Sequence, residues 1–244
     1  MSKTLTLFRR EMNAYFATPL AYVFIVIFLI MASSLTFFLG NFLERDQADL
    51  IPFFQFHPWL FILLIPAISM RLWAEEIHSG TMELLLTLPV TTAQAVLGKF
   101  LAAWIFIGVA LMLTFPIWVT VNYLGEPDNG VILASYIGSF FMAGGYLAMG
   151  AFISAMTKNQ VIAFVVSAAF CFLFTASGSP IVLNLFSGWV GDSATHFIAG
   201  LSFLTHFQDL MKGVIDFRDV LYFASLIVFF LYANTVAVDR ARGA

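Results

Sequence analysis

Residues 53–73 read FFQFHPWLFILLIPAISMRLW and residues 94–124 read QAVLGKFLAAWIFIGVALMLTFPIWVTVNYL, and between these apolar runs lies the charged segment EEIHSGTMELLLTLPVTTA at 75–93. An α-helix rises about 1.5 Å per residue, so about 20 apolar residues cross the roughly 30 Å hydrocarbon core of a bilayer. Both runs are long enough to span a membrane. The pattern predicts two spanning helices joined by an amphipathic helix that offers a docking surface to a soluble partner.

The composition indicates the same class for the whole chain. Hydrophobic residues make up 61% of the sequence and charged residues only 10%, far below the roughly 25% charged that is usual in soluble domains. We therefore expect an all-α membrane protein with a single transmembrane domain over residues 1–244. The single Cys171 provides neither a disulfide framework nor a cysteine metal site, and the net charge of −3 gives no reason to expect nucleic acid as a partner.

The distribution of apolar runs predicts six spans, at about 20–40, 53–73, 94–124, 131–156, 161–181 and 220–238. The segment 182–218 is expected on the external side. Six spans place both termini on one side, which then carries eight of the 11 lysine and arginine residues. Because lysine and arginine concentrate in cytoplasmic loops, both termini and the 75–90 segment are predicted to be cytoplasmic.

The first 18 residues have the pattern of an amphipathic helix. Their apolar residues recur at helical spacing, at Leu5, Phe8, Met12 and Tyr15. Arg9 and Arg10 lie elsewhere around the helix, where they can face anionic lipid. We expect this helix to lie on the membrane surface; the alternative is an ordinary basic flank of the first span.

The charged segment contains its own start and stop signals. Gly80 permits a turn that a side chain would obstruct, Thr81 is a candidate N-cap for a helix that begins at Met82, and Pro89 ends that helix. The residues alone indicate an element that docks a partner, or one that merely caps the bundle.

The fifth span carries a small side chain at every fourth position, at Ala163, Ser167, Cys171, Thr175 and Ser179. Such a ladder lets two helix backbones approach closely in lipid. It fits an interface between two subunits, and it equally fits packing within one subunit.

Isolated polar residues of the external side carry less information. His57 is expected at the membrane interface, at the outer end of the second span. Asp192 with His196, and His206 with Asp209, have helical spacing, but no third ligand is fixed by the sequence. We do not expect a metal site.

Residues 76–90 follow the pattern E-x-x-x-G-T-x-E-x-L-L-x-x-P-V, and G-K follows at 98–99. This segment resembles the cytoplasmic loop of type-2 ABC exporter permeases. Residues 8–24 and 201–223 resemble the beginning of the same family and the segment before its last span. Within that family the chain most resembles the gliding-motility permeases and the permeases for nitrous-oxide-reductase maturation.

The resemblance implies a permease subunit in a bacterial inner membrane, paired with a second copy or with a related or auxiliary membrane protein. This chain has no phosphate-binding glycine loop, so ATP and Mg²⁺ would be bound by two cytosolic ABC ATPases. The permease subunit itself is then expected to need no cofactor and not to be an enzyme. Residues 1–18 would be the connecting helix and 75–90 the coupling helix, and the fifth span would face the two-fold axis. The implied ATPase contacts are Glu75, Glu76, Gly80, Thr81, Glu83, Leu85, Leu86 and Pro89.

Two functions remain open at this point. The first is ATP-driven export of an unidentified hydrophobic or amphipathic solute. The second is mechanical transduction, in which the subunit drives an external or membrane partner without bulk transport. An ion-coupled carrier is disfavoured because the predicted spans hold almost no charged residues.

Overall fold

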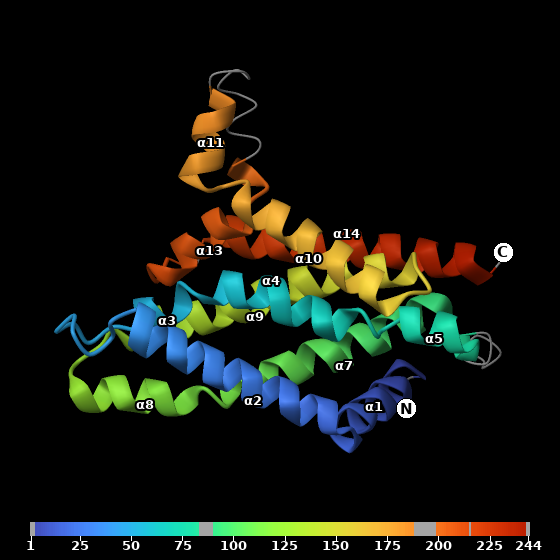
Figure 1. The fold of residues 1–244 in the computed structure, drawn as a ribbon, viewed down its shortest axis with the longest axis horizontal. Coiled ribbons are helices and arrows are strands. Elements are labelled where there is room, and N and C mark those ends of the chain that lie inside the picture. The colour runs from blue at the N-terminus through green and yellow to red at the C-terminus, as the bar shows by residue number, and fades with distance from the viewer. Residues whose placement is uncertain (1–2, 83–89, 188–198, 215, 243–244) are drawn as a thin grey trace.

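The protein is described by a computed structural model, which covers residues 3–82, 90–187, 199–214 and 216–242 (Figure 1). Within these residues the chain is helical and contains no β-strand. The helices are α1 (Lys3–Ala17), α2 (Pro19–Ser34), the π-helical η1 (Leu35–Leu39), α3 (Ile51–Phe54), α4 (His57–Ser69), α5 (Ala74–Ser79), α7 (Thr92–Met112), α8 (Phe115–Leu124), α9 (Asn129–Ala155), α10 (Gln160–Ala176), α11 (Pro180–Ser187), α13 (Phe203–Met211) and α14 (Phe217–Arg242).

Helical stretches long and apolar enough to cross a bilayer recur along the described residues. They are Pro19–Leu39, Ile51–Ser79, Thr92–Leu124, Asn129–Ala155 and Phe217–Ala241. α10, in the fifth predicted span, is apolar but has 17 residues and rises about 26 Å. It ends at Ala176 because Pro180 starts α11, which projects away from the bundle (Figure 1). The predicted multi-helix membrane fold is confirmed. In the described residues five helical stretches are long enough to be spans, against six predicted, because α10 is shorter than the fifth predicted span.

α9 forms the centre of the bundle and packs against α4, α7, α10, α13 and α14. Glycines allow this close packing. A Cβ added at Gly144 would lie 2.8 Å from the ring of Trp104, and one at Gly150 would lie closer still to Ser69 Oγ. Both distances are shorter than real contacts, so neighbouring helices approach α9 at places where no side chain fits.

Side-chain caps explain where several helices begin. Thr91 accepts a hydrogen bond from the backbone N–H of Gln94, whose side chain reaches back to the Thr91 N–H. Asp128 and Asn159 cap α9 and α10 in the simpler one-sided way. Each cap satisfies backbone donors that the first helical turn leaves free, which stabilises a helix by about 1 kcal/mol.

The small-residue ladder of α10 lies inside the chain. Ala163, Ser167, Cys171 and Thr175 are fully buried by neighbouring helices of the same molecule. The hydroxyl groups of Thr175 and Tyr146 of α9 lie 2.5 Å apart, so the ladder faces α9. The assignment of these four residues to a subunit interface is therefore wrong. Spacing predicted the close helix contact correctly, but the partner is a helix of the same chain; Ser179, beyond the end of α10, is only partly buried.

One end of the bundle gathers α1, α5, the start of α7 and the end of α14 (Figure 1). Thr92 at the start of α7 donates a hydrogen bond to Asp239 Oδ1 of α14, with an O···O distance of 2.6 Å. Much of the basic charge that predicted the cytoplasmic side lies on these elements. That the side is cytoplasmic stays a prediction.

Candidate functional site

α1 packs directly on α7. Leu7 is buried against Gly98, where an added Cβ would lie 3.0 Å from Leu7 Cδ2. The ring of Tyr15 stacks on Phe106 with centroids 5.2 Å apart. The face of α1 that packs on α7 thus contains the buried Leu7 and the partly buried Tyr15, whereas Leu5, expected on the apolar face, is 40% exposed.

The two arginines of α1 point away from this contact. Arg9 and Arg10 are exposed, and Arg10 forms an ion pair with Glu11 at 2.5 Å. Their exposure agrees with the predicted amphipathic pattern. Whether they contact lipid headgroups stays a prediction.

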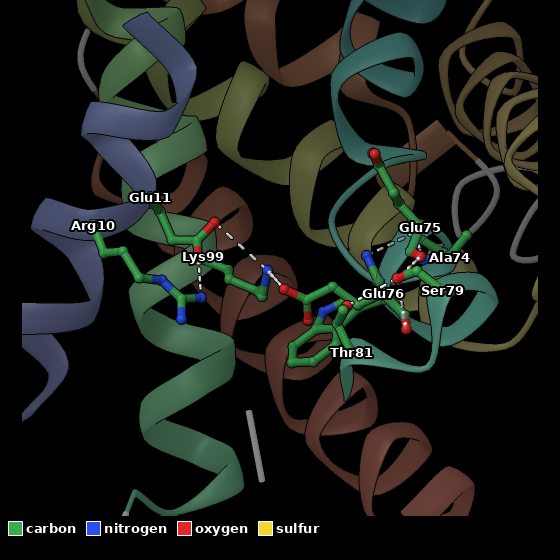
Figure 2. Close-up of polar contacts among 10 residues, drawn as sticks. Arg10, Glu11, Ala74, Glu75, Glu76, Ser79, Thr81 and Lys99 are labelled. Carbon is green, nitrogen blue, oxygen red and sulfur yellow. Dashed lines mark hydrogen bonds and ion pairs between the residues drawn. The ribbon is translucent and has the colours of Figure 1, made fainter. Parts of the chain in front are cut away.

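The most unusual side chain at this end is Lys99, a cation in the second turn of α7 that is only 4% exposed (Figure 2). Its Nζ lies 2.7 Å from Glu76 Oε1 of α5 and 3.5 Å from Glu11 Oε2 of α1. A buried ammonium is stable only when carboxylates or other acceptors replace its water. One side chain therefore joins three helices that are far apart in the sequence.

Trp73 completes the surroundings of Lys99. Its ring is 1% exposed, and the ring centroid lies 5.4 Å from Lys99 Nζ, within range for a cation–π interaction. The backbone N–H groups of Trp73 and Ala74 donate to Ser154 Oγ of α9 at 3.2 and 3.0 Å. Ser154 in turn donates to the carbonyl of Met70 at 2.9 Å. The junction between α4 and α5 is thereby fixed to α9.

α5 ends at a sharp turn. Gly80 has φ +71°, in the left-handed region that favours glycine, so the predicted turn is confirmed. Thr81 is already helical, so its prediction as an N-cap is wrong: the break falls one residue earlier. Its hydroxyl instead lies 2.9 Å from Ser79 Oγ.

The predicted ATPase contacts divide between described and undescribed residues. Glu75 is half exposed and pairs with Arg71 at 3.9 Å, whereas Glu76 is largely buried against Lys99. Residues 78–81 are exposed. Glu83, Leu85, Leu86 and Pro89 lie outside the described residues.

His57 and His206 are buried, and each meets a side chain of another helix. His57, expected at the interface, is fully buried; its Nδ1 lies 2.8 Å from Ser139 Oγ and its ring packs 4.5 Å from that of Phe53. His206 Nδ1 lies 2.6 Å from Asp219 Oδ1, so its partner is not the nearby Asp209.

In the described part of the chain, no group of three or more histidine, cysteine or acidic residues could hold a metal ion. Asp192 and His196 lie outside it.

A family model that matches most of the chain shows to which protein family it belongs. Residues 43–237 match the family model described as "ABC-2 family transporter protein". This chain belongs to the ABC-2 transporter family. With its apolar helices, an ABC-2 permease of this kind is a multi-pass membrane protein. The resemblance to ABC exporter permeases is confirmed at the level of the family, while the gliding-motility branch stays a prediction.

Curated relatives agree with this family. The chain is 30% identical over 181 residues to the "Probable multidrug ABC transporter permease YbhS" of Escherichia coli strain K12, and equally to the protein of that name in E. coli O157:H7. The alignment covers 68% of this chain and 45% of each relative. The matched region thus spans less than half the length of these relatives.

Proposed function

We propose that this ABC-2 permease is the membrane subunit of an ATP-driven exporter of a hydrophobic or amphipathic solute. In this proposal a cytosolic ATPase pushes on the tip formed by residues 78–81. The observation that carries the proposal is the buried Lys99, which ties α5 to α1 and α7.

In this proposal, force is transmitted from the exposed turn at residues 78–81 to the helices of the bundle. Residues 78–81 are accessible to a soluble partner, and Glu76, one turn of helix earlier, is held by Lys99 at 2.7 Å. Removing one member of a buried ion pair costs about 3–5 kcal/mol. Separating α5 from α7 would break the Lys99–Glu76 ion pair and cost a free energy of this size. Displacement of the tip would therefore move α7, and also α1, which is joined to Lys99 by Glu11.

The remaining parts of the assembly follow from the family resemblance. Two copies of the ATPase would bind ATP and Mg²⁺, and a second permease copy or a related membrane subunit would complete the transporter. The end that carries α1 and α5 would face the cytoplasm of a bacterial cell, because that side has most of the lysine and arginine.

The turn at Gly80 provides the test. An added Cβ at Gly80 has no neighbour within 4 Å, and the same holds at Gly200. Of these two glycines, Gly80 has a positive φ and Gly200 does not. Gly80→Ala therefore strains the turn by about 1–2 kcal/mol without a clash, and Gly200→Ala is the matched control.

The measurement is the ATPase rate of the cytosolic partner, with and without purified permease in nanodiscs. We expect Gly80→Ala to reduce the stimulation of hydrolysis at unchanged membrane insertion, and Gly200→Ala to behave as wild type. Equal stimulation by wild type and by Gly80→Ala contradicts coupling through this turn.

A further inference from the structure

A cavity of about 510 Å³ lies among α1, α2, α4, α5 and α7, and Lys99, Glu11 and Glu76 form part of its lining. Its apolar lining includes Leu20, Val23, Ile27, Leu64, Ile68 and Phe106. The three residues from α2 are 42–52% exposed and belong to a membrane-spanning helix. The apolar wall therefore continues into the lipid-facing surface, and a molecule dissolved in the bilayer can reach the cavity from the side.

Charged side chains line the same cavity. They are Glu11, Arg71, Glu75, Glu76 and Lys99. Arg10 also pairs with Glu11 from outside the cavity lining, so three basic groups face the three carboxylates and the total charge is balanced. Burial and the nearby Glu11 carboxylate raise the pKa of Tyr15, so its phenol stays neutral and does not change this balance.

The carboxylates are incompletely satisfied. Glu76 Oε1 binds Lys99, but its buried Oε2 has no hydrogen-bond partner in the described part of the chain. Glu75 is 3.9 Å from Arg71, a long contact, and half exposed. Unpaired carboxylate in a low-dielectric site is unfavourable, so a cation placed there would be stabilised.

We propose that this cavity binds a compact cationic amphiphile, a molecule with an apolar body and one delocalised or quaternary positive charge. The volume lies within the roughly 300–1,000 Å³ of small-molecule sites. The apolar wall of α2 and α4 accommodates the body, and the unpartnered Oε2 of Glu76 together with the weakly paired Glu75 selects the positive charge. A two-chain phospholipid is larger than the cavity and brings a phosphate that the carboxylates repel.

Tetraphenylphosphonium and tetraphenylborate form a probe pair of nearly identical shape and opposite charge. Binding of labelled tetraphenylphosphonium is measured at equilibrium on the permease alone in nanodiscs. The ATPase is absent, so the result is independent of the proposed coupling. We expect saturable binding of one cation per chain, without competition from tetraphenylborate.

Two variants test the walls of the site separately. Ala67→Phe fills the cavity from α4 and should weaken binding tenfold or more; Val228→Phe, on an exposed face of α14, is its control. Glu75→Gln removes a half-exposed carboxylate and should weaken binding roughly two- to fivefold. Glu44→Gln, in the loop after η1, is the charge control.

Because Glu75 is half exposed, Glu75→Gln remains informative even if Ala67→Phe fails to fold. The proposal is overturned if no saturable binding occurs, if tetraphenylborate competes as well as the cation, or if both test variants bind like their controls. Displacement of bound tetraphenylphosphonium by a zwitterionic phospholipid at lower concentration than by a second cation also overturns it, because the site would then be a lipid site.

Discussion

Replacing Lys99 by methionine should cost far more stability than replacing an exposed lysine. Methionine keeps most of the length and apolar stem but removes the charge, so Glu76 and Glu11 lose their shared cation. Their side chains are 19% and 15% exposed, so some water reaches them. We therefore expect the lower end of the range for a broken buried pair, about 3 kcal/mol.

Lys212→Met is the matched control. Lys212 pairs with Asp209 at 2.9 Å, but the two side chains are 69% and 51% exposed. Exposed pairs contribute about 0–1 kcal/mol. The same chemical change should thus have a small effect at position 212 and a large one at position 99.

The assay is equilibrium unfolding in mixed detergent micelles, followed by tryptophan fluorescence. A double-mutant cycle with Glu76→Gln isolates the pair, and a coupling of about 1–3 kcal/mol is expected for two groups in contact. Amide exchange in α1 should also accelerate in Lys99→Met, because the link through Glu11 is lost. If Lys99→Met and Lys212→Met destabilise equally, Lys99 does not hold the three helices together.

Further predictions concern the caps, the ladder and the energy source. Thr91→Ala removes the capping box of α7 and should cost about 1 kcal/mol, seen as faster amide exchange at residues 93–95. Ser167→Leu overpacks the interior between α10 and α9 and should lower stability by about 1–3 kcal/mol without changing the oligomeric state; loss of oligomer at unchanged stability would restore the subunit-interface assignment. The buried thiol of Cys171 should react with maleimide only after unfolding, and rapid labelling of the native protein would contradict its burial. In proteoliposomes with the partner ATPase, transport should stop with a hydrolysis-deficient ATPase and persist with an uncoupler at constant ATP.

The sequence predicts what depends on local pattern. Apolar run length predicted where the long apolar helices lie, except that α10 is shorter than the fifth predicted span. Gly80 predicted the turn after α5, because each of these features follows from the physics of one segment. The start of the next helix was misplaced at Thr81 because a hydroxyl residue is a typical N-cap, while the glycine before it ends the turn.

Contacts between distant segments could not be predicted in the same way. The periodicity of α1 indicates an amphipathic helix, but it does not show that Glu11 meets Lys99, or that Leu7 packs on Gly98. Likewise the ladder of α10 predicts close approach to some helix, but the sequence does not show that this helix is α9 of the same chain, where Tyr146 meets Thr175. His57 was misjudged because its partner, Ser139, comes from another span.

The hydrogen bonds of Ser154 keep the junction between α4 and α5 from acting as a hinge. A hydroxyl can accept two hydrogen bonds and donate one, and Ser154 uses all three on the backbone between α4 and α5. Rotating α5 about this junction would strand backbone groups in a buried, water-poor place. The six residues of α5 therefore form a short rigid segment about 9 Å long, which is anchored on α9 through Ser154. Under the proposed coupling, a push at the tip would be transmitted to the last turn of α9, the central helix of the bundle, instead of being absorbed by bending at the junction.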